Sequence, residues 1–342
     1  MKSQKLMIII TILLLITACS NNHNKKDPLK ASYNGMGTIA DFIIFGEETL
    51  AAEGFEKAKK IMIDIENKMS LNIEDSEINK INLQAGKDKV VVSEDTFNVI
   101  SRGLYFSELT NGSYDISIGP ITKLWNIGKN DERVPSNEEI IEKLPLVDYN
   151  KIIVDIEEKS VFLEKEGMEL DLGSIAKGYA ADKIISTFKD MGIENALINI
   201  GGNIKVLGKN PQRNRSWMVG LRNPRDARGS HFATIKLDSG KTVVTSGDYE
   251  RFFIKEGIRY HHIFDGNIGR PSKSDIIGVS IIAENSIDAD GLSTSVFLLG
   301  SKKGLNLIEQ MDGVEAVLVT KNLKLITTKG AEGFIEEMKN QL

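Results

Sequence analysis

The sequence Asp171-Leu172-Gly173-Ser174-Ile175-Ala176-Lys177-Gly178-Tyr179 joins a short apolar segment to the clearest helical pattern of the chain, residues 174–191. The glycine at the junction leaves the backbone N–H groups of the first helical turn open to a ligand. A helix end of this kind favours a phosphate or a carboxylate. The junction is therefore a candidate anion-binding site, and a tight turn beside a helix cap is the alternative interpretation.

Hydrophobic periodicity outlines the rest of the domain. Helical spacing predicts helices at residues 49–69, 94–109, 288–299 and 303–311, and a last helix from Ala331. Apolar or alternating runs predict strands at residues 38–45, 195–200, 217–221, 232–237 and 277–282. Strands and helices are too irregularly interleaved for a series of βαβ units. We therefore predict an α+β fold with mixed sheets and flanking helices in a single large domain, residues 37–342.

The N-terminus has the features of an export signal. Lys2 and Lys5 precede an apolar run at residues 6–16, which is too short to span a bilayer. The following Ile16-Thr17-Ala18-Cys19 resembles a bacterial lipobox. We predict a lipoprotein signal peptide at residues 1–18, a lipid-modified Cys19 and a polar, flexible tether at residues 19–36. An ordinary signal peptide with a chance cysteine is the alternative.

Composition excludes several classes of protein. Hydrophobic residues make up 41% and charged residues 27%, and the formal net charge is -5, so nonspecific nucleic-acid binding has no electrostatic driving force. Four histidines and one cysteine exclude a structural zinc site and a disulfide framework. No G-x-G-x-x-G follows a strand, which argues against a Rossmann dinucleotide site.

Four further stretches carry polar chemistry beside glycines: residues 112–120, 199–203, 245–249 with 261–265, and 290–294. Asp290 and Thr294 are four residues apart, so a helix places both side-chain oxygens on one face. Together with a backbone carbonyl they form a set of hard oxygens suited to Mg²⁺, completed by phosphate oxygens and water. An N-capped helix is the plainer interpretation of this segment.

The order of these motifs resembles the FAD:protein FMN transferase (ApbE) family over residues 38–327. In sequence order the chain shows Gly-x-Tyr-Asp, Gly-Pro, Leu-Trp, Asp-Leu-Gly-x-Ile-Ala-Lys-Gly-Tyr-x-x-Asp, Ile-Gly-Gly-Asn, Ser-Gly-Asp-Tyr, His-Ile-x-Asp and Ala-Asp-x-x-Ser-Thr. The resemblance implies a T-fold-related domain that cleaves FAD at its pyrophosphate. FMN would pass to a threonine hydroxyl of an acceptor protein, and AMP would be released.

The resemblance also implies a set of site residues. FAD would be contacted by Met69, Ser113, Tyr114, Asp115, Asp171, Lys177 and His261. Mg²⁺ would be bound by the backbone carbonyl of Ser174 and by the side chains of Asp290 and Thr294. The chain departs from the common family pattern at four places, one of which is Ile116-Ser117, where the family more often has Pro-Thr. Tyr114 replaces Phe, with little expected effect, Gly291 replaces Ala, and Gly266 replaces Pro, which predicts a looser loop after His262.

A general base is needed because a hydroxyl is a poor nucleophile at neutral pH. His262 is the first candidate, since an unperturbed histidine titrates near pH 6.5, and Asp265 is the second. Mg²⁺-dependent hydrolysis of FAD to FMN and AMP, and a flavin-binding lipoprotein without catalysis, are the alternative functions.

The family resemblance places the enzyme on the outer face of the bacterial cytoplasmic membrane, which is the periplasmic side in a diderm. A lipid on Cys19 would hold it there. Its partners would be FAD and an acceptor, either a redox-complex subunit or an FMN-binding lipoprotein. Nucleic acid is not expected as a partner.

Overall fold

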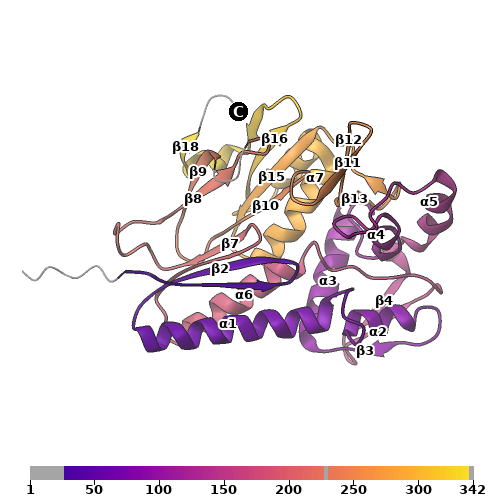
Figure 1. Cartoon of the computed structure of the whole chain (residues 1–342), viewed down its shortest axis with the longest axis horizontal. Coiled ribbons are helices and arrows are strands. Elements are labelled where there is room, and N and C mark those ends of the chain that lie inside the picture. Colours follow the sequence, from indigo (N-terminus) through magenta and orange to yellow (C-terminus); the bar gives the residue numbers. More distant parts are fainter. Residues whose placement is uncertain (1–26, 227–229, 339–342) are drawn as a thin grey trace, which may run out of the picture.

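The computed structural model describes residues 27–226 and 230–338, and its centre is an eight-stranded sheet in which all neighbouring strands are antiparallel (Figure 1). In spatial order the strands are β1 (Leu29–Gly35), β2 (Thr38–Phe45), β6 (Asn195–Ile200), β7 (Asn203–Leu207), β10 (Thr242–Gly247), β15 (Ile276–Ala283), β16 (Glu315–Thr320) and β17 (Leu325–Thr327). Every residue of β15 is buried, because layers cover both faces of the sheet at its middle.

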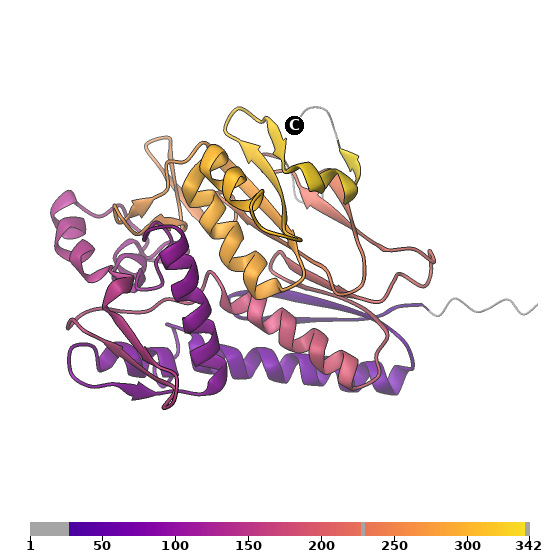
Figure 2. The same ribbon diagram turned by 180° about the vertical axis from the view of Figure 1, so that it is seen from behind.

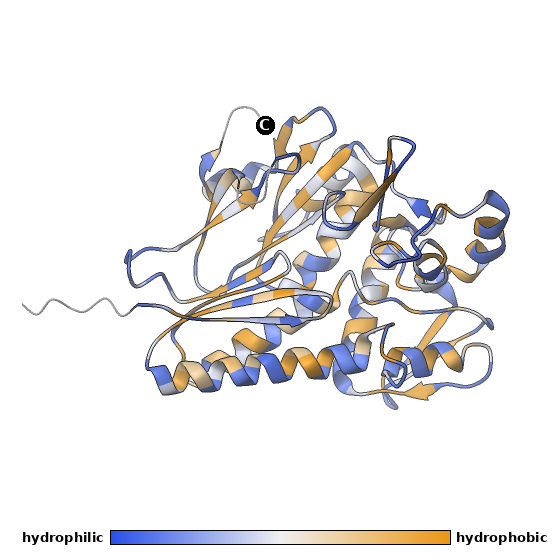
Figure 3. Cartoon of the chain, in the orientation of Figure 1, coloured by the Kyte–Doolittle hydropathy of each residue, from blue (hydrophilic) through white to orange (hydrophobic). Residues whose placement is uncertain are grey.

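Helices cover one face of the sheet and a smaller sheet covers the other. Figure 2 shows the helical layer from its own side. It consists of α1 (Glu48–Met69), α3 (Glu94–Leu109), α6 (Ala176–Asp190) and α7 (Ser286–Ile308). The opposite layer consists of β8 (Trp217–Arg222), β9 (His231–Leu237) and β18 (Ile335–Met338). Trp217 and Phe232 pack there with Val243, Ile282 and Val317 of the large sheet. Apolar residues are accordingly dense along β15 and its neighbours (Figure 3).

Short elements complete the domain beside the ends of α1 and α3. The remaining helices are α2 (Glu77–Leu83), α4 (Gly119–Trp125) and α5 (Asn137–Lys143), with 3-10 turns at Leu144–Leu146, Tyr149–Lys151 and Lys329–Gly333. The remaining strands are β3 (Val90–Val91), β4 (Ile152–Asp155), β5 (Ser160–Leu163), β11 (Phe252–Lys255), β12 (Ile258–His261), β13 (Phe264–Asp265) and β14 (Arg270–Pro271). The predicted α+β fold with flanking helices is confirmed.

The prediction of a flexible tether through residue 36 is wrong for its second half, which forms β1. Leu29, Ala31 and Tyr33 alternate with exposed residues and pack on the main core. Met36 and Gly37 both have positive φ, 52° and 68°, as a two-residue hairpin turn of type I′ requires. The predicted signal peptide and Cys19 lie outside the described residues. Within the described residues no helix is both long and apolar enough to cross a membrane.

Of the helix predictions near the C-terminus, one agrees with the structure and one is wrong. The separate helices predicted at residues 288–299 and 303–311 correspond to the two helical segments of α7, which are divided at Gly300, where φ is 78°. The helix predicted from Ala331 is instead a 3-10 turn followed by β18, which pairs with β9. Ala331 is buried under that small sheet, so tertiary packing overrides the local preference.

The crossing of α6 and α7 depends on Gly178. A Cβ at this position would lie 2.2 Å from the carbonyl oxygen of Ser286 and 2.8 Å from Cβ of Asp290. Because Gly178 has no side chain, its backbone N–H donates a hydrogen bond of 2.9 Å to Oδ2 of Asp290. Asp182, one turn further along α6, accepts from the backbone N–H groups of Ser286 and Ile287, each at 2.9 Å. Asp182 therefore caps α7 from a neighbouring helix, while Asn285 provides no side-chain cap.

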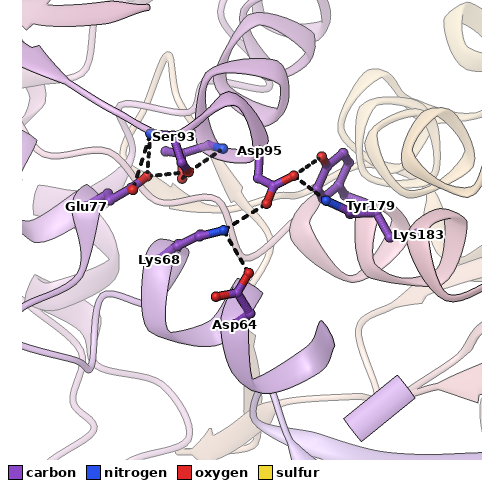
Figure 4. A network of polar contacts seen from close by, with 8 residues as sticks. Asp64, Lys68, Glu77, Ser93, Asp95, Tyr179 and Lys183 are labelled. Atoms are coloured by element: carbon purple, nitrogen blue, oxygen red, sulfur yellow. Dashed lines mark hydrogen bonds and ion pairs between the residues drawn. The ribbon is translucent and has the colours of Figure 1, made fainter. Parts of the chain in front are cut away.

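A half-buried ionic network around Asp95 joins α6 to α1 and α3 (Figure 4). The Asp95 carboxylate accepts from Nζ of Lys68 at 2.8 Å and from the Tyr179 hydroxyl at 2.6 Å, and it pairs with Lys183. Burial alone would raise the pKa of Asp95, but the hydrogen bonds from Lys183, Lys68 and Tyr179 lower it well below its ordinary value. The network holds the start of α6 in place, which explains Tyr179 in the motif.

Replacing Gly178 by alanine is expected to force α6 and α7 apart. The added methyl group would meet backbone atoms, which cannot rotate away, so the free energy of unfolding should fall by about 1–3 kcal/mol in a urea titration. The control is Gly46→Ala, where an added Cβ meets nothing within 4 Å. Equal stability of the two variants would contradict the packing described.

Candidate active site

A cleft of about 250 Å³ opens where the start of α6 meets the end of α1, the α4 segment and the β1–β2 turn. It is lined by Met36, Gly37, Ile65, Glu66, Met69, Ser70, Leu71, Asn72, Thr122, Lys123, Asn126, Ile127, Lys129, Asp171, Leu172, Gly173, Ala176, Lys177 and Arg251. Three of the predicted FAD-contacting residues are therefore in the wall, namely Met69, Asp171 and Lys177.

The wall of the cleft carries more positive than negative charge. Lys123, Lys129, Lys177 and Arg251 line it, against the carboxylates of Glu66 and Asp171. The chain as a whole has a net charge of -5, so this local excess of cations is a feature of the site. An anionic ligand is the kind of molecule that such a wall attracts.

The motif at residues 171–178 is fixed by its own hydrogen bonds. Oδ1 of Asp171 accepts from the backbone N–H of Gly173 at 2.9 Å, and Oδ2 accepts from the Thr122 hydroxyl at 2.9 Å. Nζ of Lys177 donates to the Gly173 carbonyl at 2.9 Å. Asp171 therefore ties α4 to the loop before α6, and Lys177 is held against the same loop.

Asp290 lies directly behind this wall and is only 3% exposed. Burial raises its pKa, while the charge of Lys177 and the Gly178 N–H oppose that rise. The Ser174 hydroxyl is 2.9 Å from the Tyr114 hydroxyl, and the charge of Asp290 acts on Tyr114. The start of α6 thus brings Ser174 and Asp290 to one region. Thr294 lies one turn further along α7, with its hydroxyl 3.4 Å from that of Ser246.

These oxygens fit a hard divalent cation. A buried carboxylate, a hydroxyl and a backbone carbonyl are the donors that Mg²⁺ prefers, and ligand oxygens or water would have to complete the shell. Among the described residues no three His, Cys, Asp or Glu side chains group closely enough to hold a metal by themselves. Any cation here therefore depends on mixed donors such as those of Ser174, Asp290 and Thr294.

The two adjacent histidines differ in what their rings can do. In His261, Nδ1 accepts from the backbone N–H of Ile263 and Nε2 faces the Ser272 carbonyl at 3.1 Å, so both nitrogens are used within the fold. In His262, Nδ1 is 3.1 Å from the Arg251 carbonyl, which can only accept. Nδ1 of His262 therefore carries the hydrogen, and Nε2 keeps a free lone pair. His262, which is not among the residues lining the cleft, is thus the histidine whose second ring nitrogen is left for another partner.

Burial lowers the pKa of His262 below its ordinary value, and the charges of Arg251 and Lys177 lower it further. Both of these cations line the cleft. The ring is consequently neutral at physiological pH and can act as a hydrogen-bond acceptor.

The remaining predicted residues form a braced loop beside the cleft. Asp115 is 7% exposed and accepts from Ser117 and from the backbone N–H of Tyr149; burial raises its pKa to about 6. Ser113 accepts from Nδ2 of Asn267 and, through its carbonyl, from the backbone N–H of Gly266. Oδ1 of Asp265 accepts from the Asn267 N–H at 3.0 Å. None of Ser113, Asp115 and Asp265 is among the residues that line the cleft.

The expected loosening of the loop at Gly266 is wrong. Its N–H donates to the Ser113 carbonyl at 2.9 Å, and a Cβ there would lie 2.3 Å from the Gly112 carbonyl oxygen. Gly266 therefore permits a close backbone approach, and a proline could neither donate that hydrogen bond nor fit.

Several lining residues were not anticipated from the sequence, above all Lys123, Lys129 and Arg251. Two of them are close to quoted motifs: Lys123 precedes Leu124-Trp125, and Arg251 comes two residues after Tyr249. The position of Lys123 and Arg251 within or beside glycine-rich motifs could have indicated that they line the site. Lys129 carried no such signal, because only the fold brings it to the cleft.

Comparison with known proteins identifies the family. The ApbE family model matches residues 36–318. The chain belongs to the ApbE family. It is 36% identical over 280 residues to an FAD:protein FMN transferase of Klebsiella pneumoniae, covering 82% of this chain and 85% of the relative. It is 32% identical over 337 residues to one of Treponema pallidum, covering 94% of this chain and 92% of the relative.

Solved structures of ApbE proteins have the same fold. The crystal structure of the ApbE protein of Thermotoga maritima superposes with a TM-score of 0.83 at 31% identity, covering 91% of this chain and all of that one. The flavin transferase ApbE of Vibrio cholerae superposes with a TM-score of 0.81 at 24% identity, covering 90% of this chain and 99% of that one. The expected single ApbE-like domain is confirmed.

Within this ApbE-family chain, the hydroxyl of Tyr114 has a structural role that a phenylalanine could not have. Tyr114 is buried, and its hydroxyl forms a hydrogen bond with the Ser174 hydroxyl. The ring of Tyr114 packs edge-on against Phe106. Gly291 leaves room for that packing, since a Cβ there would lie 2.3 Å from the Phe106 ring.

The variant Tyr114→Phe tests the hydrogen bond between the two hydroxyls. Loss of the bond should lower the free energy of unfolding by about 1 kcal/mol, measured by urea titration. The companion variant Ser174→Ala should cost a similar amount, and the double variant should cost less than the sum of the two. Strictly additive losses would show that the two hydroxyls do not interact.

Proposed function

We propose that this chain transfers FMN from FAD to a threonine hydroxyl of an acceptor protein and releases AMP. The observation that carries the proposal is the bond between the Gly178 N–H and Asp290, which sets a buried carboxylate beside Lys177 behind a cation-lined cleft. The names of the relatives, FAD:protein FMN transferase, support the same reaction. FAD carries two phosphates, and their negative charge is complementary to the positive charge of the cleft wall.

The residues that would hold Mg²⁺ are Ser174 through its backbone carbonyl, Asp290 and Thr294. When bound, the cation neutralises charge on the two phosphates and polarises the phosphorus that is attacked. Lys177 is placed to add a second positive charge on the same side. Asp290 is suited to its role because Lys177 and the Gly178 N–H favour its ionised form.

In the transfer, the threonine oxygen forms a bond to the phosphorus of the FMN half. The bond from that phosphorus to the bridging oxygen breaks, and AMP leaves with the bridging oxygen. The proton of the threonine hydroxyl passes to Nε2 of His262, whose free lone pair follows from the Arg251 contact of Nδ1. Asp265 is a weaker candidate for the base, because its carboxylate is held by Asn267.

The proposal includes export and anchoring through a lipid on Cys19, at the outer face of the cytoplasmic membrane. The described chain begins just before β1, and the turn at the other end of β1 lines the cleft through Met36 and Gly37. A strand of 7 residues spans about 23 Å. The start of β1 and the cleft are therefore separated by the length of that strand, and the segment after Cys19 would connect the lipid to β1.

Asp290→Asn tests the transfer itself. The change keeps the size of the side chain and removes its charge, so transfer should fall at least about 100-fold. The reaction contains protein without residues 1–18, FAD, Mg²⁺ and an acceptor, and mass spectrometry measures added FMN on threonine. The control is Asp288→Asn, two residues away on α7, where the carboxylate pairs with Arg102.

The outcomes separate the possible functions. AMP formed without any modified acceptor would indicate FAD hydrolysis. Intact FAD after long incubation with Mg²⁺ and acceptor would indicate a binding protein. Full activity of Asp290→Asn in the presence of a chelator would contradict the assigned metal site.

His262→Gln tests the base through the pH dependence of the reaction. The lowered pKa keeps His262 unprotonated in the free enzyme as the pH falls through 6.5. The acidic limb of kcat/KM for FAD should therefore lie below pH 6.5. His262→Gln should reduce transfer about 100-fold or more and remove that limb. A wild-type limb at or above pH 6.5 would contradict the assignment.

A further inference from the structure

Asn203 presents a buried oxygen that the fold does not use. The residue is 1% exposed, and its Oδ1 is one of three buried side-chain atoms without a hydrogen-bond partner among the described residues. It starts β7, immediately after Gly201 and Gly202, which both have positive φ. An unpaired buried carbonyl oxygen costs about 1–3 kcal/mol, so its position calls for an explanation.

The side chain of Asn203 faces the helical layer and Asp290. Residues 203 and 205 share one face of β7, and Nζ of Lys205 reaches Asp182 on α6 at 2.6 Å. From the same face, the amide group of Asn203 hydrogen bonds the Asp290 carboxylate. Only the NH₂ of the amide can donate to a carboxylate, so the amide orientation is set and Oδ1 is the atom left over.

We propose that Asn203 is a further member of the divalent-cation site, with Nδ2 orienting Asp290 and Oδ1 accepting a hydrogen bond from a water on the cation. The inference rests on the cation site of the proposed function. Mg²⁺ retains several waters when a protein binds it, and those waters need acceptors. A neutral amide oxygen beside a single carboxylate provides one without adding a second negative charge to a buried region.

A purely structural role of Asn203 makes different predictions. Its Nδ2 is 3.4 Å from the Ile200 carbonyl, across the turn between β6 and β7, and that contact could brace the hairpin. In that case a substitution would lower stability and leave cation binding unchanged. If Oδ1 belongs to the cation site, a substitution of Asn203 changes cation binding even when the hairpin keeps its stability.

The test measures binding of Mn²⁺, as a probe for Mg²⁺, by electron paramagnetic resonance in the presence of ADP and without acceptor. Asn203→Leu keeps the volume and removes both polar atoms, so the Kd for Mn²⁺ should rise about 10- to 100-fold. The matched control is Asn199→Ala in β6. The Asn199 side chain accepts from the Gly202 N–H at 2.9 Å and braces the same turn. Its Kd should stay at the wild-type value.

A second variant covers the case in which Asn203→Leu does not fold. Asn203→Asp places a second carboxylate beside Asp290, so Mn²⁺ should raise its Tm by more than it raises that of the wild type. An unchanged Kd in a folded Asn203→Leu, or an equal Tm rise in Asn203→Asp, would overturn the role of Asn203 alone. Failure of the wild type to bind Mn²⁺ would overturn the cation site of the proposed function as well.

Discussion

The site depends on one close contact, the crossing of α6 and α7 at a residue without a side chain. Gly178 lets the two helices approach until its N–H reaches Asp290, and a methyl group there would overlap the Ser286 carbonyl. Asp182 strengthens the crossing by capping α7 from α6, and the Asp95 network holds α6 against α1 and α3. The helix packing therefore places the carboxylate.

Electrostatics then determines what the site can hold. Asp290 is buried, which raises its pKa, and Lys177 and the Gly178 N–H oppose that rise. Burial lowers the pKa of His262, and the charges of Arg251 and of the same lysine lower it further. The positive charge of the cleft wall suits an anionic ligand, and the divalent cation that we propose would bind beside it.

The sequence predicted the fold class and the central motif, because both are local. Apolar spacing identified α1, α3 and most central strands, and the 171–182 motif identified the start of α6. The predictions failed where tertiary contacts determine the secondary structure or the position of a side chain. β1 forms because β2 pairs with it, and residues 335–338 extend because β9 pairs with them. Lys129 has no local signal, since the fold alone brings it to the cleft. Asn203 ends the Ile-Gly-Gly-Asn motif, but its contact with Asp290 could not be predicted, because the two residues meet only in the fold.

The central claim is that oxygens of residues 174, 290 and 294 bind one divalent cation at the diphosphate of FAD. Anomalous diffraction from a crystal grown with Mn²⁺ and FAD locates that cation directly. The account predicts one strong Mn²⁺ peak in contact with the Ser174 carbonyl, the Asp290 carboxylate and the Thr294 hydroxyl, and with the FAD phosphates. FAD bound in the cleft with no Mn²⁺ peak at Asp290 would contradict it.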